Sequence, residues 1–212
     1  MVCPARPEIN LAQFPIPAGY EIRNFEEKDL PAWLELNKCE GLTTRCYDAL
    51  YKPMLEEFKQ NCFLAVEKKD GKVVGSCAYY PAYGGKIATG HWFFVREDLR
   101  EKGIGEALLS RCMQKVPMGQ PVYLTTHAKN FDAIALYLKH GCYFVTQNLN
   151  GPKRQRPWGD NFQKAKAFIQ EGLKTTERGK EALTNWKEQE MVDPSSFAAL
   201  KAILTITDRN EL

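Results

Sequence analysis

The sequence lacks the features that mark membrane, metal-binding and nucleic-acid-binding proteins. No apolar run approaches the ~20 residues of a membrane-spanning helix, so we expect no membrane partner. The 7 cysteines and 3 histidines show no metal-ligand spacing such as C-x-x-C or H-E-x-x-H, so we expect no metal. The 29 basic and 26 acidic residues give a net charge of only +3, which is too mild to indicate nucleic acid as a partner.

A secretory signal and a cysteine framework are also missing. Residues 1–19 contain no apolar stretch of the kind that a signal peptide needs. The cysteines are scattered and odd in number, which favours reduced thiols over disulfides. They are Cys3, Cys39, Cys46, Cys62, Cys77, Cys112 and Cys142. We therefore expect a soluble, cytoplasmic protein, and a content of 44% hydrophobic and 26% charged residues is typical of one.

Composition divides the 212 residues into three parts. Residues 1–19 carry four prolines and predict an irregular N-terminal arm. Residues 20–150 alternate strand-like and helix-like patterns and predict the main domain. Residues 151–212 begin with a basic, proline-bounded stretch and continue with apolar stripes within 162–173 and 193–204, which predict a helical C-terminal extension. We expect this extension to pack against its own domain, and a homodimer contact is the alternative.

The periodicity of the central part predicts a mixed series of strands and helices. One helix is expected to begin at Asp29, and a helical stretch over residues 44–59 is interrupted near Pro53. The Asp70-Gly71 pair between two alternating runs predicts a β-hairpin. Strands are predicted over residues 20–25, 61–68, 72–80, 87–95, 121–126 and 142–148. The resulting order is a strand, two helices, three antiparallel strands, and then helices that alternate with strands.

The segment of residues 89–107 is the most informative part of the sequence. It holds an apolar run, then Arg100, Gly103 and Gly105 in the pattern R-x-x-G-x-G, and then a helix predicted to open on Glu106. Glycines before a helix let the backbone come close to a ligand, and the N–H groups and dipole of the helix start favour a phosphate. The segment therefore predicts a pyrophosphate-binding loop.

The same glycines could in principle belong to two other nucleotide-binding motifs. A Rossmann fingerprint needs a third glycine, and a Walker motif needs a lysine followed by serine or threonine after its second glycine. Both requirements are unmet in this segment. An ordinary glycine-rich turn between a strand and a helix stays open from the segment taken alone.

A second motif follows at residues 130–142, after the predicted strand 121–126. Asn130 is suited to cap a helix and Gly141 to end it. The two motifs in this order resemble those of the GNAT superfamily of acyl-CoA-dependent N-acyltransferases. In that family R/Q-x-x-G-x-G/A is followed by N-x-x-A-x-x-L-Y-x-x-x-G-F. The resemblance extends over residues 20–148.

This resemblance implies a fold and an activity. The implied fold class is α/β (α+β), with a mixed, mostly antiparallel central sheet that is flanked by helices. The implied activity is that of an N-acetyltransferase, which moves an acetyl group from acetyl-CoA, its co-substrate, to a primary amine by direct attack in a ternary complex. The alternative is a non-catalytic acyl-CoA-binding sensor or interaction module of the same fold.

The resemblance also assigns residues to CoA. Backbone groups of Phe93, Phe94 and Val95 are expected to pair with the pantetheine arm, and Asn130 matches a position that contacts CoA in relatives. The pyrophosphate is expected at backbone N–H groups of the first motif, with a charged contact from the arginine. The motif residues concerned are Arg100, Glu101, Lys102, Gly103, Ile104, Gly105 and Glu106. The alternatives are a loop salt bridge for the arginine and a helix cap for the asparagine.

By the same resemblance Tyr137 is the expected general acid, whose phenol protonates the departing thiolate. Some relatives place a glutamate base at the position of Thr125, which is unable to act as a base near neutral pH. His91 lies on the face of the predicted strand 87–95 that relatives use for bases, and it is the expected base or proton relay. His127 is the alternative base. For the tyrosine and for the strand histidine, a buried structural side chain is the alternative role.

The acceptor is a small-molecule or peptide amine that the motifs do not identify. Peptide N-terminus, lysine, polyamine, aminoglycoside and arylalkylamine all fit. Aromatic residues in the regions that form acceptor walls are each better explained as core, and they are Trp33, Tyr47, Tyr51, Tyr79, Tyr80 and Tyr83. Glu40 and Asp48 carry charges suited to an amine, but such carboxylates are usually solvated. His140 is explained by its place near a helix C-terminus.

Overall fold

The computed structural model describes residues 1–3, 14–82, 87–117, 120–145 and 162–189. The chain divides into two compact units. Residues 5–122 form the first, here called the sheet unit, and residues 1–4 with 123–212 form the second, here called the helical unit. The predicted division at 150/151 lies outside the described residues and stays a prediction.

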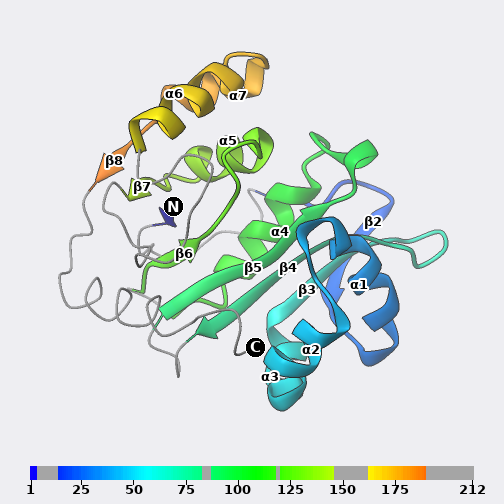
Figure 1. Ribbon diagram of the computed structural model, residues 1–212. Helices are drawn as coiled ribbons and strands as arrows, with labels where there is room; N and C mark the ends of the chain where they lie inside the picture. The colour runs from blue at the N-terminus through cyan, green and yellow to red at the C-terminus, as the bar shows by residue number, and fades with distance from the viewer. Residues whose placement is uncertain (4–13, 83–86, 118–119, 146–161, 190–212) are drawn as a thin grey trace. The chain divides into compact units, whose positions relative to one another are not determined.

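Four antiparallel strands form the sheet of the sheet unit (Figure 1). They are β2 (Tyr20–Asn24), β3 (Cys62–Glu67), β4 (Val73–Ala82) and β5 (Ile87–Val95), and they lie in the order β5-β4-β3-β2. The predicted hairpin between β3 and β4 is confirmed. Gly71 adopts a φ of +73°, and the Asp70 carboxylate accepts a hydrogen bond of 3.0 Å from the N–H of Lys72. Glycine fits this left-handed position without strain.

The predicted helical stretch 44–59 is divided at Pro53 as expected. Its parts are α2 (Thr44–Leu50), the short 3-10 turn η4 (Lys52–Met54) and α3 (Leu55–Asn61), and α1 (Leu30–Asn37) precedes them. Buried aromatic rings of these helices pack on the sheet, which confirms the core interpretation of Trp33, Tyr47 and Tyr51. Tyr83 lies outside the described residues.

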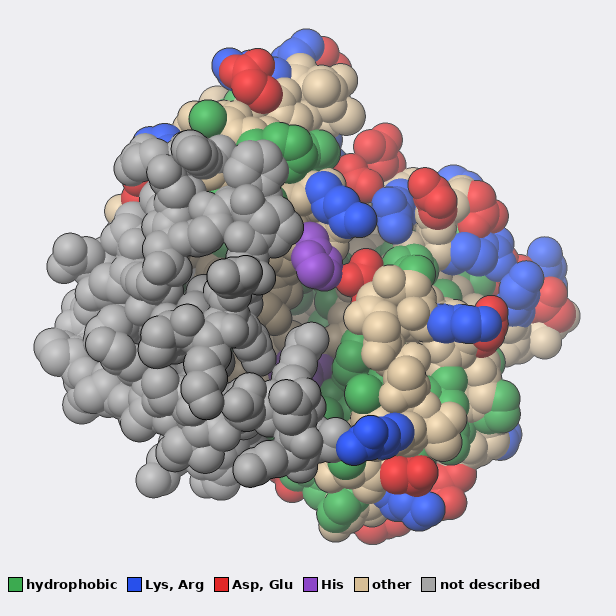
Figure 2. Space-filling view, in the orientation of Figure 1, with side chains coloured by type: hydrophobic (Ala, Val, Ile, Leu, Met, Phe, Trp, Pro, Cys, Tyr) green, Lys and Arg blue, Asp and Glu red, His purple; other side chains and the backbone are tan. Residues whose placement is uncertain are grey.

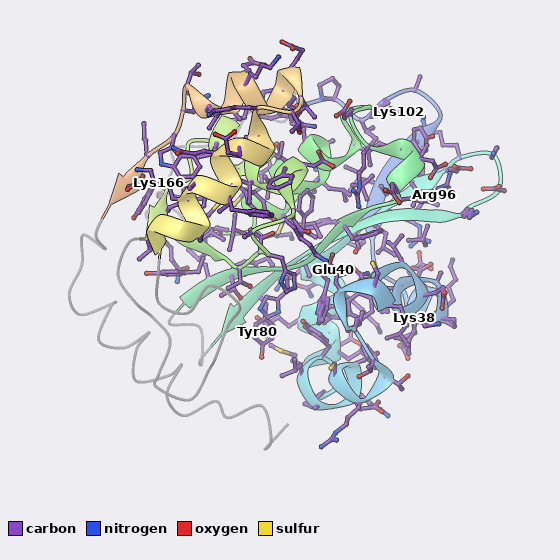
Figure 3. All side chains as sticks on the ribbon, turned by 45° about the horizontal axis from the view of Figure 1, so that its top comes forward. Lys38, Glu40, Tyr80, Arg96, Lys102 and Lys166 are labelled. Atoms are coloured by element: carbon purple, nitrogen blue, oxygen red, sulfur yellow. A yellow bond between two sulfur atoms is a disulfide. The ribbon has the colours of Figure 1, made fainter. Side chains whose placement is uncertain are left out.

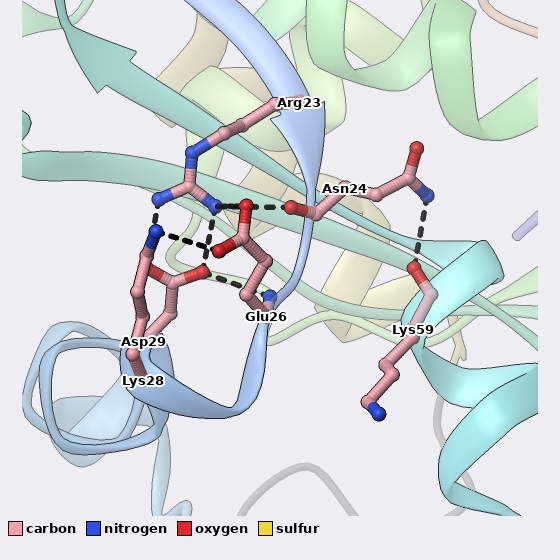
Figure 4. Close-up of polar contacts among 6 residues, drawn as sticks. All are labelled: Arg23, Asn24, Glu26, Lys28, Asp29 and Lys59. Carbon is pink, nitrogen blue, oxygen red and sulfur yellow. Dashed lines mark hydrogen bonds and ion pairs between the residues drawn. The ribbon is translucent and has the colours of Figure 1, made fainter.

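An ion pair holds the first helix against the edge strand (Figure 4). Arg23 of β2 donates two hydrogen bonds, of 2.6 and 2.7 Å, to the two oxygens of Asp29, which also accepts a bond of 2.9 Å from the Glu26 N–H. Burial by itself raises the pKa of Asp29, but the hydrogen bonds from Arg23 and Glu26 outweigh it and lower that pKa. The carboxylate therefore stays charged and fixes the turn η2 (Glu27–Asp29) before α1.

Helix α4 (Ile104–Met113) covers the sheet through an almost wholly buried set of side chains. It begins at Ile104, two residues before the predicted opening at Glu106, because Gly103 and not Gly105 takes the left-handed conformation that starts the helix. The helix comes very close to β4: a Cβ atom added at Gly75 would lie 2.9 Å from Leu108 Cδ1. A side chain at this strand position would press on Leu108 and on the Phe94 carbonyl, 3.1 Å from the added Cβ atom.

The helical unit contains α5 (Phe131–Lys139), α6 (Phe162–Leu173) and α7 (Glu177–Leu183). Ile134 and Leu138 of α5 pack with Ile169 and Leu173 of α6 and with Ala182 of α7. The expectation that the C-terminal extension packs against the preceding domain is thus confirmed for α6 and α7, which pack on α5. The predicted helical segment within 193–204 lies outside the described residues, and a homodimer stays a prediction.

Four short strands lie wholly or partly in the helical unit. The first is β1 (Val2–Cys3), which neighbours β6 (Val122–Leu124), and the Leu124 N–H donates to the Met1 carbonyl at 2.9 Å. The other pair is β7 (Phe144–Val145) and β8 (Glu188–Gln189), which is parallel. Strand β6 is shorter than the predicted 121–126, and the described part of the predicted strand 142–148 is limited to β7.

The prediction of reduced thiols is wrong for two cysteines. Cys3 of β1 and Cys142 after α5 form a disulfide, and Cys39, Cys46, Cys62, Cys77 and Cys112 are free. The two partners are 139 residues apart in the chain, so spacing gave no indication of their pairing. The short N-terminal strand, which the composition did not predict, carries Cys3 to its partner.

Candidate functional site

Strand β5 contains a bulge at its centre. Ser76 of β4 pairs with Phe94, and Ala78 pairs with His91, so β5 holds one residue more than β4 over this stretch. Trp92 lies in the bulge with a φ of +48°, a value that side-chain-bearing residues rarely adopt. The Ser76 hydroxyl donates to the Trp92 carbonyl at 2.7 Å, and the buried Asn37 amide of α1 donates to Ser76 Oγ at 3.0 Å. This polar chain fixes the displaced backbone.

His91 is held by two tyrosines beside the bulge. Its Nδ1 lies 2.9 Å from the hydroxyl of Tyr51, the last residue before η4, and the indole N–H of Trp92 donates to the same hydroxyl. Tyr80 of β4, labelled in Figure 3, stacks on the imidazole with ring centroids 4.9 Å apart. Burial lowers the pKa of His91 to about 4 and raises the pKa of Tyr51. Both side chains are therefore neutral at pH 7.

The low pKa of His91 predicts a loss of stability in weak acid. The unfolded chain, with a histidine pKa of about 6.5, takes up the proton first, so the contribution of His91 is complete above pH 6.5 and falls as the pH drops toward 4. Each pH unit of acidification in this window lowers the free energy of unfolding by up to about 1.4 kcal/mol. Denaturant unfolding at pH 7.5, 6, 5 and 4.5 measures the effect. In His91→Asn the side chain does not titrate in this pH range, so the free energy of unfolding is expected to fall less steeply with decreasing pH. Equal slopes in the wild type and the variant contradict the low pKa of His91.

The connection from β5 to α4 contains the residues that the sequence predicts to bind phosphate. Arg96 begins it, with ion pairs to Glu67 at 3.1 Å and to Asp98 at 2.6 Å, and Lys102 donates to the Asp98 carbonyl at 3.1 Å (Figure 3). Glu101 has a φ of +63°, and Gly103 one of +86°. These conformations turn the chain sharply into α4, whose first-turn N–H groups have no acceptor within the helix.

Arg100 lies at the side of this loop. Its Nε donates to the Val95 carbonyl at 3.4 Å, and its guanidinium carbon is 5.7 Å from the centre of the Phe94 ring. Phe93, Phe94 and Val95 are half-buried, and Arg100 to Gly103 are exposed. His91, the end of β5 and the whole R-x-x-G-x-G loop thus all belong to the sheet unit.

The second motif lies in the helical unit. Tyr137 of α5 is buried, with 4% of its surface exposed. Asn130 stands at the N-cap position, but its side chain makes no capping bond and instead lies 3.4 Å from Thr126 Oγ1, so the prediction of side-chain capping is wrong. Gly141, with a φ of +74°, ends the helix as predicted.

The remaining sequence candidates occupy different environments. His127 and Thr125 are exposed, and His140 is buried at the C-terminal end of α5. The sequence predicts Tyr51 as a core residue but not its contact with His91, because nothing in the sequence links residues 40 positions apart. Over the described residues, no group of histidine, cysteine and acidic side chains is placed to hold a metal ion.

The described surface carries charges of both signs in the view of Figure 2. Many of the lysines are paired with nearby carboxylates, such as Lys28 with Glu26 at 2.6 Å and Lys59 with Glu27 at 2.8 Å. No helix in the described ranges has the length and apolar character needed to cross a membrane.

A model of the acetyltransferase (GNAT) family matches residues 21–142. The chain belongs to this family. The match covers more than half of the 212 residues. It runs from the second residue of β2 through β6 and α5 and includes the loop before α4. The mixed α/β architecture, with its mostly antiparallel sheet flanked by helices, is the GNAT acetyltransferase fold. No curated protein matches the chain.

Solved GNAT structures resemble the chain at low identity. An acetyltransferase of the family from Staphylococcus aureus is 18% identical to this chain, with a TM-score of 0.46. The superposition covers 57% of this chain and 83% of the Staphylococcus aureus chain. Diaminobutyrate acetyltransferase from Paenibacillus lautus, in complex with its substrate and coenzyme A, is 22% identical with a TM-score of 0.47, covering 57% and 74%. The ribosomal-protein-S18-alanine N-acetyltransferase from Escherichia coli is 22% identical with a TM-score of 0.42, covering 57% and 75%.

Proposed function

We propose that this GNAT protein transfers an acetyl group from acetyl-CoA to a primary amine, with both substrates bound at once. The observation that carries the proposal is the loop from Arg100 to Gly103 at the start of α4, with its left-handed Gly103 and exposed basic side chains. A helix N-terminus with aligned N–H groups is an anion site. We assign the CoA pyrophosphate to residues 100–106 and the pantetheine arm to the backbone of residues 93–95, with a further contact from Asn130.

The chemistry requires one bond to form and one to break. The neutral amine nitrogen attacks the thioester carbonyl carbon, negative charge develops on the carbonyl oxygen, and the carbon–sulfur bond then breaks. We assign Tyr137 as the acid that gives its phenolic proton to the thiolate. We assign His91 as the base or proton relay that takes the amine proton. The acceptor itself is a small-molecule or peptide amine.

Binding of CoA can be tested separately from catalysis. Gly103→Ala is expected to weaken acetyl-CoA binding about tenfold, because an L-residue at a φ of +86° costs roughly 1–2 kcal/mol and relaxes by moving the N–H groups of the loop. Thermal-shift titration with acetyl-CoA and CoA measures this, since a ligand of the native state raises its stability.

The matched control is Gly71→Ala in the β3–β4 turn. This glycine also has a positive φ, of +73°, and open space around its Cβ position. The control is expected to lose similar stability but to keep the affinity for acetyl-CoA. Equal affinity in both variants removes the loop assignment. No shift with any CoA species removes the proposed function altogether.

The same protein preparation separates an enzyme from a sensor. A panel of primary amines, with release of the CoA thiol as the readout, is expected to reveal an acceptor. Binding of acetyl-CoA without turnover on peptides, lysine, polyamines, aminoglycosides and arylalkylamines favours the sensor. The exposed Thr125, at the position where some relatives carry a glutamate base, is the feature that supports this second function.

A further inference from the structure

One tyrosine hydroxyl contacts two consecutive residues of β5. The side chains of neighbouring residues in a regular strand point to opposite faces of the sheet, yet His91 and Trp92 both hydrogen-bond to the hydroxyl of Tyr51. The bulge makes this arrangement possible, because the φ of +48° at Trp92 interrupts the alternation. The unusual backbone conformation of Trp92 thus brings its indole N–H to Tyr51, the hydrogen-bond partner of His91.

The donors and acceptors of this cluster define the position of the histidine proton. The indole N–H of Trp92 is only a donor, so the Tyr51 oxygen accepts from it. Tyr51 is fully buried, and the polar neighbours that the described residues give its hydroxyl are Trp92 and His91. A buried O–H group needs an acceptor, and Nδ1 of His91 is the acceptor at hand. A neutral imidazole that accepts at Nδ1 carries its proton on Nε2.

We propose that Tyr51 is a positioning residue that holds His91 as the Nε2–H tautomer, so that His91 presents a hydrogen-bond donor to a substrate oxygen. The ligand part of this inference rests on the proposed acetyl transfer, and the tautomer part does not. In the reaction, His91 keeps its proton and donates from Nε2 to the thioester carbonyl oxygen, where negative charge develops during attack. The amine proton leaves to water, so His91 acts as a hydrogen-bond donor in place of the base or relay role assigned to it above.

The surroundings of the ring support a fixed and neutral donor. Tyr80 stacks on the imidazole with an interplanar angle of 18° and limits rotation of the ring. The Ser76 hydroxyl donates to the Trp92 carbonyl, and the Asn37 amide donates to Ser76 Oγ, so the two residues fix the bulge that positions the indole. A neutral imidazole with a fixed N–H polarises a carbonyl without a proton transfer, which is a known catalytic use of histidine.

Nitrogen NMR of the side chains tests the tautomer without any ligand. At pH 7 the resonance of His91, assigned by its loss in His91→Gln, is expected to show a protonated Nε2 and an unprotonated Nδ1. Tyr51→Phe removes the hydroxyl, and a shift toward the Nδ1–H form is expected. Tyr47→Phe, a buried tyrosine of the same aromatic cluster, is expected to leave the wild-type pattern unchanged.

The outcomes of this experiment are decisive. A protonated Nδ1 in the wild type overturns the inference, and so does an unchanged tautomer in folded Tyr51→Phe. If Tyr51→Phe does not fold, the wild-type spectrum alone decides, since it shows directly which nitrogen carries the proton.

Kinetics with an acceptor from the amine panel test the donor role. His91→Gln keeps an N–H group near the Nε2 position but is not a base, whereas His91→Leu has neither property. The donor role predicts that Gln retains turnover within about tenfold while Leu loses about 10²–10³. Equal losses in Gln and Leu indicate a base and overturn the donor role, as does full turnover in both. If the wild type turns over no amine, the proposed function fails, while the NMR result stands by itself.

Discussion

Replacing Tyr137 with phenylalanine is expected to lower kcat for acetyl transfer by about 10²–10⁴, the usual contribution of a general acid. The substitution removes one hydroxyl from a side chain that is 4% exposed, so the ring still fills its place in α5 and the fold is retained. The affinity for acetyl-CoA is expected to stay nearly constant, since the proton is needed only as the thiolate departs. Thiol release measures turnover, and thermal shift measures affinity.

The matched control for this variant is Tyr143→Phe. Tyr143 belongs to the same unit, is half-buried, and has a pKa raised by burial, but it lies outside the motif. It is expected to keep wild-type turnover. Wild-type kcat in Tyr137→Phe removes the general-acid role, and equal losses in both variants point to a general effect of losing a phenol from the helical unit.

Replacing Gly179 with alanine is expected to destabilise the helical unit by about 3 kcal/mol or more through overpacking. Gly179 lies in the first turn of α7, and a Cβ atom there would overlap the backbone carbonyl of Leu173 at the end of α6. The Gly179 N–H also donates to the capping hydroxyl of Thr176 at 3.0 Å, so the helix cannot shift without losing its cap. Hydrogen exchange of the α6 and α7 amides measures the change.

Gly172→Ala is the comparison that sharpens this prediction. A Cβ at Gly172 would meet the ring of Phe131 and not a backbone atom, and a half-buried ring is able to turn aside. At both positions alanine is also favoured over glycine in a helix, by about 1 kcal/mol. We expect Gly172→Ala to cost clearly less than Gly179→Ala. The reverse order contradicts the close approach between α7 and the α6 backbone.

Features set by neighbouring residues were predictable from the sequence. The Asp70-Gly71 turn, the break at Pro53 and the end of α5 at Gly141 each depend on the conformational preference of one or two residues. The family motifs were visible for the same reason, since each lies within a short segment. The start of α4 was predicted two residues late, because the sequence offers two glycines and does not show that Gly103 takes the left-handed conformation.

Features set by distant residues were not predictable from one sequence. The Tyr51–His91 contact depends on the register of β4 with β5 and on a bulge of one residue, neither of which has a local signal. The Asn130 side chain bonds to Thr126 although its residue type favours capping. The pairing of Cys3 with Cys142 depends on where the first strand lies.

The disulfide makes much of the chain a closed covalent ring. The backbone from Cys3 to Cys142, joined by the bond between their sulfur atoms, contains the whole of the sheet unit and the beginning of the helical unit. A single break in the backbone anywhere within that ring opens it but separates nothing. A protein molecule cut once by a protease in the β3–β4 turn therefore stays one covalent species under denaturing conditions until the disulfide is reduced, and reduction then yields two fragments.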